Sequence, residues 1–172
     1  MAIVYTSREQ VEVYRFSLPA AIIIPLAAIF LQAFIPLRLP FFSTIDLPLL
    51  VTIFFAVARR NQISGLITGS IIGLLQDSLT HQPIGLFGIA KTVVGYGASS
   101  LGVKLDVENA GSRFLVTFGF YLLHEIVYFT VARGLVGQAT AWRWGYTVTA
   151  AVANGVVALP LFLLLDRFKQ RT

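Results

Sequence analysis

Long apolar runs separated by short polar segments dominate the pattern of this 172-residue chain. Each run approaches the roughly 20 residues that an α-helix needs to cross a bilayer. Charged residues, prolines and short polar turns mark where the runs end. The pattern predicts six transmembrane helices, at residues 18–37, 45–58, 63–79, 84–103, 113–132 and 145–165. The second run is short, and whether it spans the bilayer completely is left open.

The predicted connections are short, so consecutive helices are expected to be antiparallel neighbours. We therefore predict one all-α domain over residues 1–172, a polytopic integral membrane bundle of six transmembrane helices. Composition agrees with this fold class, because the chain is 56% hydrophobic and only 12% charged. Soluble domains carry about 25% charged residues. So few charges could not cover the surface of a water-soluble globule of this size.

The distribution of basic residues predicts the orientation. With the N-terminus inside, three basic residues face outward and nine face the cytoplasm, the latter being Arg8, Arg15, Arg59, Arg60, Lys104, Arg113, Arg167, Lys169 and Arg171. This bias predicts that both termini lie in the cytoplasm. If the second run did not cross, five spans would remain and the termini would lie on opposite sides. The basic residues form no stripe, which excludes a nucleic-acid surface.

Small residues recur at helical spacing in the third and fourth predicted helices. In the third helix glycine recurs every four residues, at Gly65, Gly69 and Gly73, and in the fourth helix Gly88 and Gly95 are seven residues apart. Each set therefore lies on one face of its helix. Such faces let helices approach closely in lipid. Two readings remain open: the two helices pack on each other in a tight hairpin, or the glycine face receives a transmembrane helix of a partner.

The turn between these helices contains Pro83 and Gly85. Pro83 is predicted near the first turn of the fourth helix, where its missing N–H costs little. His81 precedes them and is predicted at the outer headgroup boundary, as a solvated side chain rather than a ligand.

Four ionisable residues fall inside or at the edge of the predicted spans: Asp46, Asp77, Lys91 and Glu125. Each would be costly if it faced lipid as an ion, so each is expected to face protein or water. Asp46 is predicted to cap the second helix. Asp77 is predicted to reach interfacial water and to bond the turn at residues 83–85.

Lys91 is the most deeply placed of these charges. It lies at a depth similar to that of Glu125 in the fifth predicted helix. We predict an ion pair of Lys91 with Glu125, or with Asp77, inside the bundle. The alternative is that the long Lys91 side chain extends to the membrane surface.

No catalytic or metal-binding set is evident. His124 and Glu125 begin an H-E-x-x-H pattern, but Tyr128 stands where the second histidine would be. The chain has no cysteine, and its second histidine is distant in sequence. We therefore predict no enzyme activity, no metal and no cofactor.

The segment from Asp46 to Gly102 resembles the MreD family of bacterial rod-shape-determining membrane proteins. The similarity is carried by the Asp that begins the second helix, Arg59-Arg60, Gly65-Leu66, the G-L-L-Q-D run at 73–77, the P-x-G-L turn at 83–86 and T-V-V-G-Y at 92–96. Lys91 departs from the resemblance, since a neutral residue is expected there.

The resemblance implies a scaffold of the elongasome, the machinery that inserts peptidoglycan into the side wall. It implies direct binding to MreC, and indirect links to MreB, RodA and a penicillin-binding transpeptidase. Contacts with lipid and with partner helices, at the glycine face of the third helix, are the expected mode of action. The alternative is a small-molecule-binding subunit resembling the S-component of an energy-coupling-factor transporter, with a pocket lined by Asp77, Lys91, His124, Glu125 and Asn154.

Overall fold

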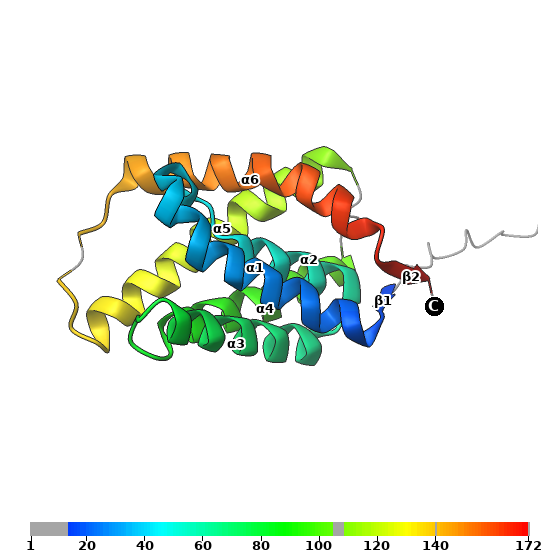
Figure 1. Cartoon of the computed structure of the whole chain (residues 1–172), viewed down its shortest axis with the longest axis horizontal. Helices are drawn as coiled ribbons and strands as arrows, with labels where there is room; N and C mark the ends of the chain where they lie inside the picture. Colours follow the sequence, from blue (N-terminus) through cyan, green and yellow to red (C-terminus); the bar gives the residue numbers. More distant parts are fainter. Residues whose placement is uncertain (1–13, 105–108, 140, 172) are drawn as a thin grey trace, which may run out of the picture.

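The computed structural model describes residues 14–104, 109–139 and 141–171. In order, the elements are β1 (Tyr14–Phe16), α1 (Leu18–Arg38), the 3₁₀ helix η1 (Pro40–Thr44), α2 (Leu47–Arg59), α3 (Gln62–Leu79), α4 (Leu86–Lys104), α5 (Ala110–Gly134), α6 (Trp144–Asp166) and β2 (Lys169–Arg171). The helices form one bundle (Figure 1). The predicted all-helical architecture of six helices is confirmed, with every helix end within three residues of its predicted position.

The two ends of the described chain lie together. Strand β1 pairs antiparallel with β2, and Arg15 stands opposite Gln170. Both strands lie at the same end of the bundle (Figure 1). The alternative in which the termini separate is therefore wrong. This small sheet was not predicted, because three-residue strands show no detectable alternation of polar and apolar positions. Arg8, which was counted among the cytoplasmic charges, lies outside the described residues.

Four of the described helices are long and apolar enough to cross a membrane: α1, α4, α5 and α6. The chain therefore has the helices of a membrane protein. The prediction of six independent spans holds only in part, because α2 and α3 do not meet this criterion. Helix α2 is too short, and α3 carries Gln76 and Asp77, whose side chains are buried within the protein.

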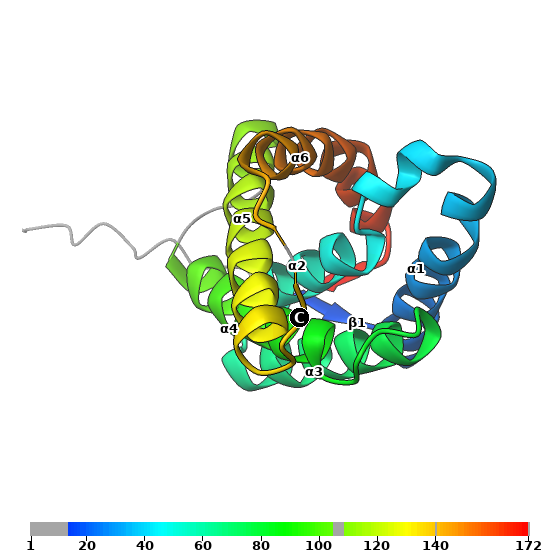
Figure 2. The ribbon, with the colours of Figure 1, turned by 90° about the vertical axis from the view of Figure 1, so that its left-hand side faces the viewer.

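Helix α2 is the centre of the bundle. Viewed from the end opposite the termini, α2 lies inside a ring formed by the other helices (Figure 2). Nearly all of its residues are buried, and six of its apolar side chains belong to the core cluster, more than any other helix contributes. Its 13 residues span about 20 Å, less than the ~30 Å hydrocarbon core. A short helix is tolerated here because the surrounding protein, rather than lipid, covers both its sides and its start.

Helices α3 and α4 pack with their backbones almost in contact. A Cβ atom at Gly65, Gly69 or Gly73 would overlap a backbone carbonyl of α4, and one at Gly95 would overlap the carbonyl of Gly65. Gly88 faces the side chain of Leu74 in α3. The structure therefore confirms the first of the two predictions, in which the two helices pack on each other in a tight hairpin. The faces are filled within the chain and leave no room for a partner helix.

We expect the substitution Gly69→Ala to destabilise the protein by about 1–3 kcal/mol, the usual range for overpacking. The added methyl group would overlap the Lys91 carbonyl, which belongs to a helix backbone and has little room to move. Thermal unfolding of the detergent-solubilised protein measures this loss.

Gly119→Ala is the matched control, because it also lies inside a helix but a Cβ there meets nothing within 4 Å. It should be neutral or slightly stabilising, since alanine favours helix. Equal melting temperatures of the two variants would contradict the close packing of α3 on α4.

Candidate functional site

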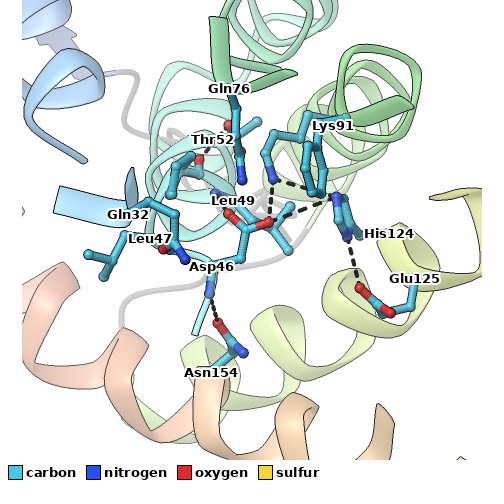
Figure 3. A network of polar contacts seen from close by, with 12 residues as sticks. Gln32, Asp46, Leu47, Leu49, Thr52, Gln76, Lys91, His124, Glu125 and Asn154 are labelled. Atoms are coloured by element: carbon cyan, nitrogen blue, oxygen red, sulfur yellow. Dashed lines mark hydrogen bonds and ion pairs between the residues drawn. The ribbon is translucent and has the colours of Figure 1, made fainter. Parts of the chain in front are cut away.

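Asp46 lies immediately before α2 and is the centre of a buried polar cluster (Figure 3). Its Oδ1 accepts a hydrogen bond of 2.9 Å from the backbone N–H of Leu49. Its Oδ2 lies 2.5 Å from Lys91 Nζ of α4. The carboxylate therefore caps α2 with one oxygen, as predicted, and forms an ion pair with the other.

Two amide side chains hold the backbone around Asp46. The Asp46 N–H donates to Asn154 Oδ1 of α6 at 2.9 Å, and the Leu47 N–H donates to Gln32 Oε1 of α1 at 3.0 Å. Asn154 Nδ2 donates in turn to the carbonyls of Thr44 and Ala150, each at 2.9 Å. Apart from the bond to Ala150, which lies within α6, these bonds satisfy backbone groups from the end of η1 to the start of α2.

The cluster lies deep in the bundle. Asn154 is about 15 Å along α6 from Trp144, and His124 is about 15 Å along α5 from Gly134, at 1.5 Å per residue. At such depth water is scarce, and an irregular backbone is stable only where protein groups replace it. Gln32 and Asn154 supply those groups to the segment that leads into α2.

Lys91 is fully buried, and its ammonium group has three neighbours. Besides Asp46, Nζ lies 3.4 Å from His124 Nε2 of α5 and 5.1 Å from the centre of the Phe87 ring. His124 stacks on Phe87, and its Nδ1 lies 3.5 Å from Glu125 Oε1. A chain of polar contacts thus runs from Asp46 through Lys91 and His124 to Glu125, whose side chain is 28% exposed.

The predicted partner of Lys91 was wrong. The ion pair is with Asp46, and Glu125 contacts His124 instead. Extension of Lys91 to the membrane surface is also wrong, because its side chain has no exposed area. The prediction failed because a second helix that begins at residue 45 and spans the bilayer would have Asp46 at the membrane boundary, far from the level of Lys91. In the structure η1 and the residues after it bring Asp46 down to the level of Lys91.

Asp77 belongs to a separate arrangement. Its carboxylate accepts hydrogen bonds from the N–H groups of Gly85, Phe87 and Gly88, at 2.8, 2.9 and 3.1 Å. It therefore bonds the α3–α4 turn as predicted. The expectation that it also reaches interfacial water is wrong, since Asp77 is fully buried.

The turn itself differs in detail from the prediction. Helix α4 begins at Leu86, so Pro83 precedes the helix rather than lying in its first turn. The Pro83 carbonyl accepts from the Leu86 N–H at 3.3 Å. Gly85 has a φ of 108°, which L side chains rarely adopt. His81 is exposed at this turn.

The cluster at α2 is suited to holding helices together rather than to binding a substrate. Asp46, Lys91 and Asn154 use their polar groups on one another or on the backbone. Among the described residues no group of three or more His, Asp or Glu side chains is placed to hold a metal ion. Two buried polar atoms near the cluster, Gln76 Oε1 and His124 Nδ1, have no hydrogen-bond partner in the described protein.

Sequence reasoning missed Gln32, and it placed Asn154 only in the alternative pocket. Both are single amides inside long apolar helices, α1 and α6. A lone amide within a membrane span is unfavourable without a partner, and this signal could have identified both residues. No sequence pattern indicates that both amides bond the backbone at the start of α2.

Comparison with known proteins gives one match. The family model described as "MreD: rod shape-determining protein MreD" matches residues 14–171. No curated protein and no solved structure matches the chain.

We expect Lys91→Met to destabilise the protein by about 3–5 kcal/mol, because it leaves the Asp46 carboxylate buried without its counter-charge. Asp46→Asn removes the charge and preserves a capping oxygen. The double variant should therefore regain a large part of the loss. Thermal or denaturant unfolding in detergent measures the coupling.

Lys91→Met combined with Glu125→Gln is the control, because Glu125 contacts His124 and not Lys91. This pair should show little recovery. Recovery as large as that with Asp46→Asn would contradict the assignment of the ion pair.

Proposed function

The chain belongs to the MreD family of rod shape-determining membrane proteins, and we propose that it is a non-enzymatic scaffold of the elongasome that binds MreC directly. The family match over residues 14–171 is the observation that carries this proposal. It extends the resemblance seen between Asp46 and Gly102 to nearly the whole chain. The role in cell shape belongs to the family, and the scaffold mechanism, the part in peptidoglycan synthesis and the partner are the proposal.

The distribution of charge supports an orientation with both termini in the cytoplasm, and the family match supports the bacterial inner membrane as the location. The end of the bundle that holds β1 and β2 also holds Arg15, Arg59, Arg60, Arg113 and Lys169. The opposite end has three basic residues, at the end of α1, the end of α5 and the start of α6: Arg38, Arg133 and Arg143. Basic residues are retained preferentially on the cytoplasmic side.

A scaffold mechanism fits a protein whose interior is occupied by its own contacts. The groups that the alternative S-component reading would place in a pocket include Lys91, His124 and Asn154. All three are buried, and each contacts other groups of the chain. Links to MreB, RodA and a penicillin-binding transpeptidase are part of the proposal as indirect contacts through MreC.

The surface that we assign to the MreC helix is a hollow of about 350 Å³ between α4 and α5. The glycine faces of α3 and α4 are unsuitable, because they are filled by each other. Gly119 lies in the hollow with nothing near its missing side chain, so a partner's side chain could approach the backbone there. The lining is entirely apolar and consists of Leu101, Leu115, Val116, Gly119, Phe120 and Leu123.

Replacing the native MreD of a rod-shaped bacterium tests the function. We expect depletion of MreD to produce rounded cells, and expression of this chain together with its own MreC to restore rods. Cell length-to-width ratio is the measurement. Cells that stay rounded while the protein is present in the membrane would contradict the proposed role.

Gly119→Leu tests the docking surface, because the added side chain projects into the hollow. We expect it to reduce co-purification of MreC from detergent-solubilised membranes while the melting temperature of the chain is unchanged. Gly145→Leu is the matched control, since Gly145 also has open space around it but lies at the start of α6. Full MreC recovery with Gly119→Leu, or equal loss with both variants, would exclude this surface.

A further inference from the structure

A second hollow lies at the end of the bundle that holds the chain ends. It has a volume of about 400 Å³ and is formed where β1, the end of α2 and the start of α3 meet. Its lining combines two arginines with aromatic rings and small polar groups: Tyr14, Arg15, Phe16, Arg59, Asn61 and Ser64. The polar cluster at Asp46 does not include any of these residues.

Arg59 is held in a fixed position in this hollow. Its Nη1 donates to Ser64 Oγ at 3.1 Å. Its guanidinium carbon lies 5.7 Å from the centre of the Phe16 ring and 5.2 Å from that of Phe55. Contacts of this kind fix the plane of the guanidinium group. The hydrogen bond to Ser64 uses one N–H, so several donors remain for a ligand.

Positive charge at this end is not balanced within the described protein. The carboxylate of Asp166 is shared between Arg113 and Lys169, at 2.6 and 2.7 Å. Neither Arg15 nor Arg59 forms an ion pair with any described residue. Guanidinium groups that keep free donors in a partly apolar hollow are suited to an anion with several oxygens, and phosphate matches their forked geometry.

The surroundings indicate that the phosphate belongs to a lipid. The hollow lies where α2 ends and α3 begins, at the end of the bundle that the distribution of basic residues assigns to the cytoplasmic side. Exposed apolar side chains lie close in sequence to its lining residues, at the starts of α1 and α3, where Leu18 is 75% and Ile63 71% exposed. The acyl chains of a lipid would pack against these apolar side chains while its headgroup occupies the hollow. Basic pockets at the cytoplasmic boundary are typical sites for anionic lipid headgroups.

We propose that Arg15, Arg59 and Ser64 bind the phosphate headgroup of an anionic phospholipid in the cytoplasmic leaflet. A lipid at this place would bridge β1 to the α2–α3 connection and neutralise charge that the described protein leaves unpaired. The site depends on membrane insertion with this end in the cytoplasm. It does not depend on MreC binding.

Binding is tested on the full-length detergent-solubilised chain. Native mass spectrometry compares how many molecules of phosphatidylglycerol and of phosphatidylcholine, with the same acyl chains, stay bound to the protein. Thermal unfolding measures how much each lipid raises the melting temperature. We expect selective retention of phosphatidylglycerol. Arg15→Gln and Arg59→Gln should each weaken it about tenfold, the loss expected for one charge-assisted hydrogen bond. Arg59→Lys should also weaken it, because lysine lacks the forked geometry.

Arg167→Gln is the matched control, since Arg167 is exposed at the same end but does not line the hollow. It should retain the lipid as the wild-type chain does. Equal loss with Arg167→Gln would show unspecific charge attraction and overturn the site. If inorganic phosphate stabilised the chain as much as phosphatidylglycerol does, the site would bind a soluble anion and the lipid proposal would be wrong. If Arg59→Gln does not fold, Arg15→Gln decides the outcome, because Arg15 is exposed and has no packing role in the core.

Discussion

The ion pair between Asp46 and Lys91 is the interaction on which the arrangement of this bundle depends. It joins the start of α2 to α4 inside the bundle, where the Lys91 side chain has no exposed area and that of Asp46 is only 13% exposed. An unpaired charge there would cost several kcal/mol. The pair is therefore tolerable only when α2 begins at this level and α4 presents Lys91 to it.

The position of α2 follows from that pairing and from the amides around it. Gln32 of α1 and Asn154 of α6 bond the backbone on either side of the peptide that leads into α2. Side chains from α1, α4 and α6 therefore all contact the start of α2, and His124 of α5 contacts Lys91. A helix of 13 residues can begin inside a membrane protein because four neighbouring helices supply the contacts that water would supply outside.

The same arrangement explains why the molecule is expected to act through its surfaces. Its glycine faces are closed by the α3–α4 contact, and its buried charges are paired. The described surface includes two hollows of different kinds: an apolar one at Gly119, and a basic one at Arg59 at the end of the bundle that holds the chain ends. The first is suited to a helix in the bilayer and the second to a charged group at its boundary. Each is formed by side chains from at least two elements, so neither exists before the bundle has assembled.

The sequence by itself determined the six helices, their limits to within a few residues and the membrane character of the chain, because apolar run length and helix-ending residues are local properties. It also indicated Asp46 as a cap and Asp77 as the residue that bonds the α3–α4 turn, since both bonds join residues close in sequence. Only the tertiary structure decided that Lys91 pairs with Asp46, 45 residues away, and that Gln32 and Asn154 hold the start of α2. Depth in a bundle is set by how a connection bends back between helices. The bend at η1 is a result of packing. Counting residues along a presumed second span therefore placed Asp46 at the membrane boundary, whereas it lies inside the bundle beside Lys91.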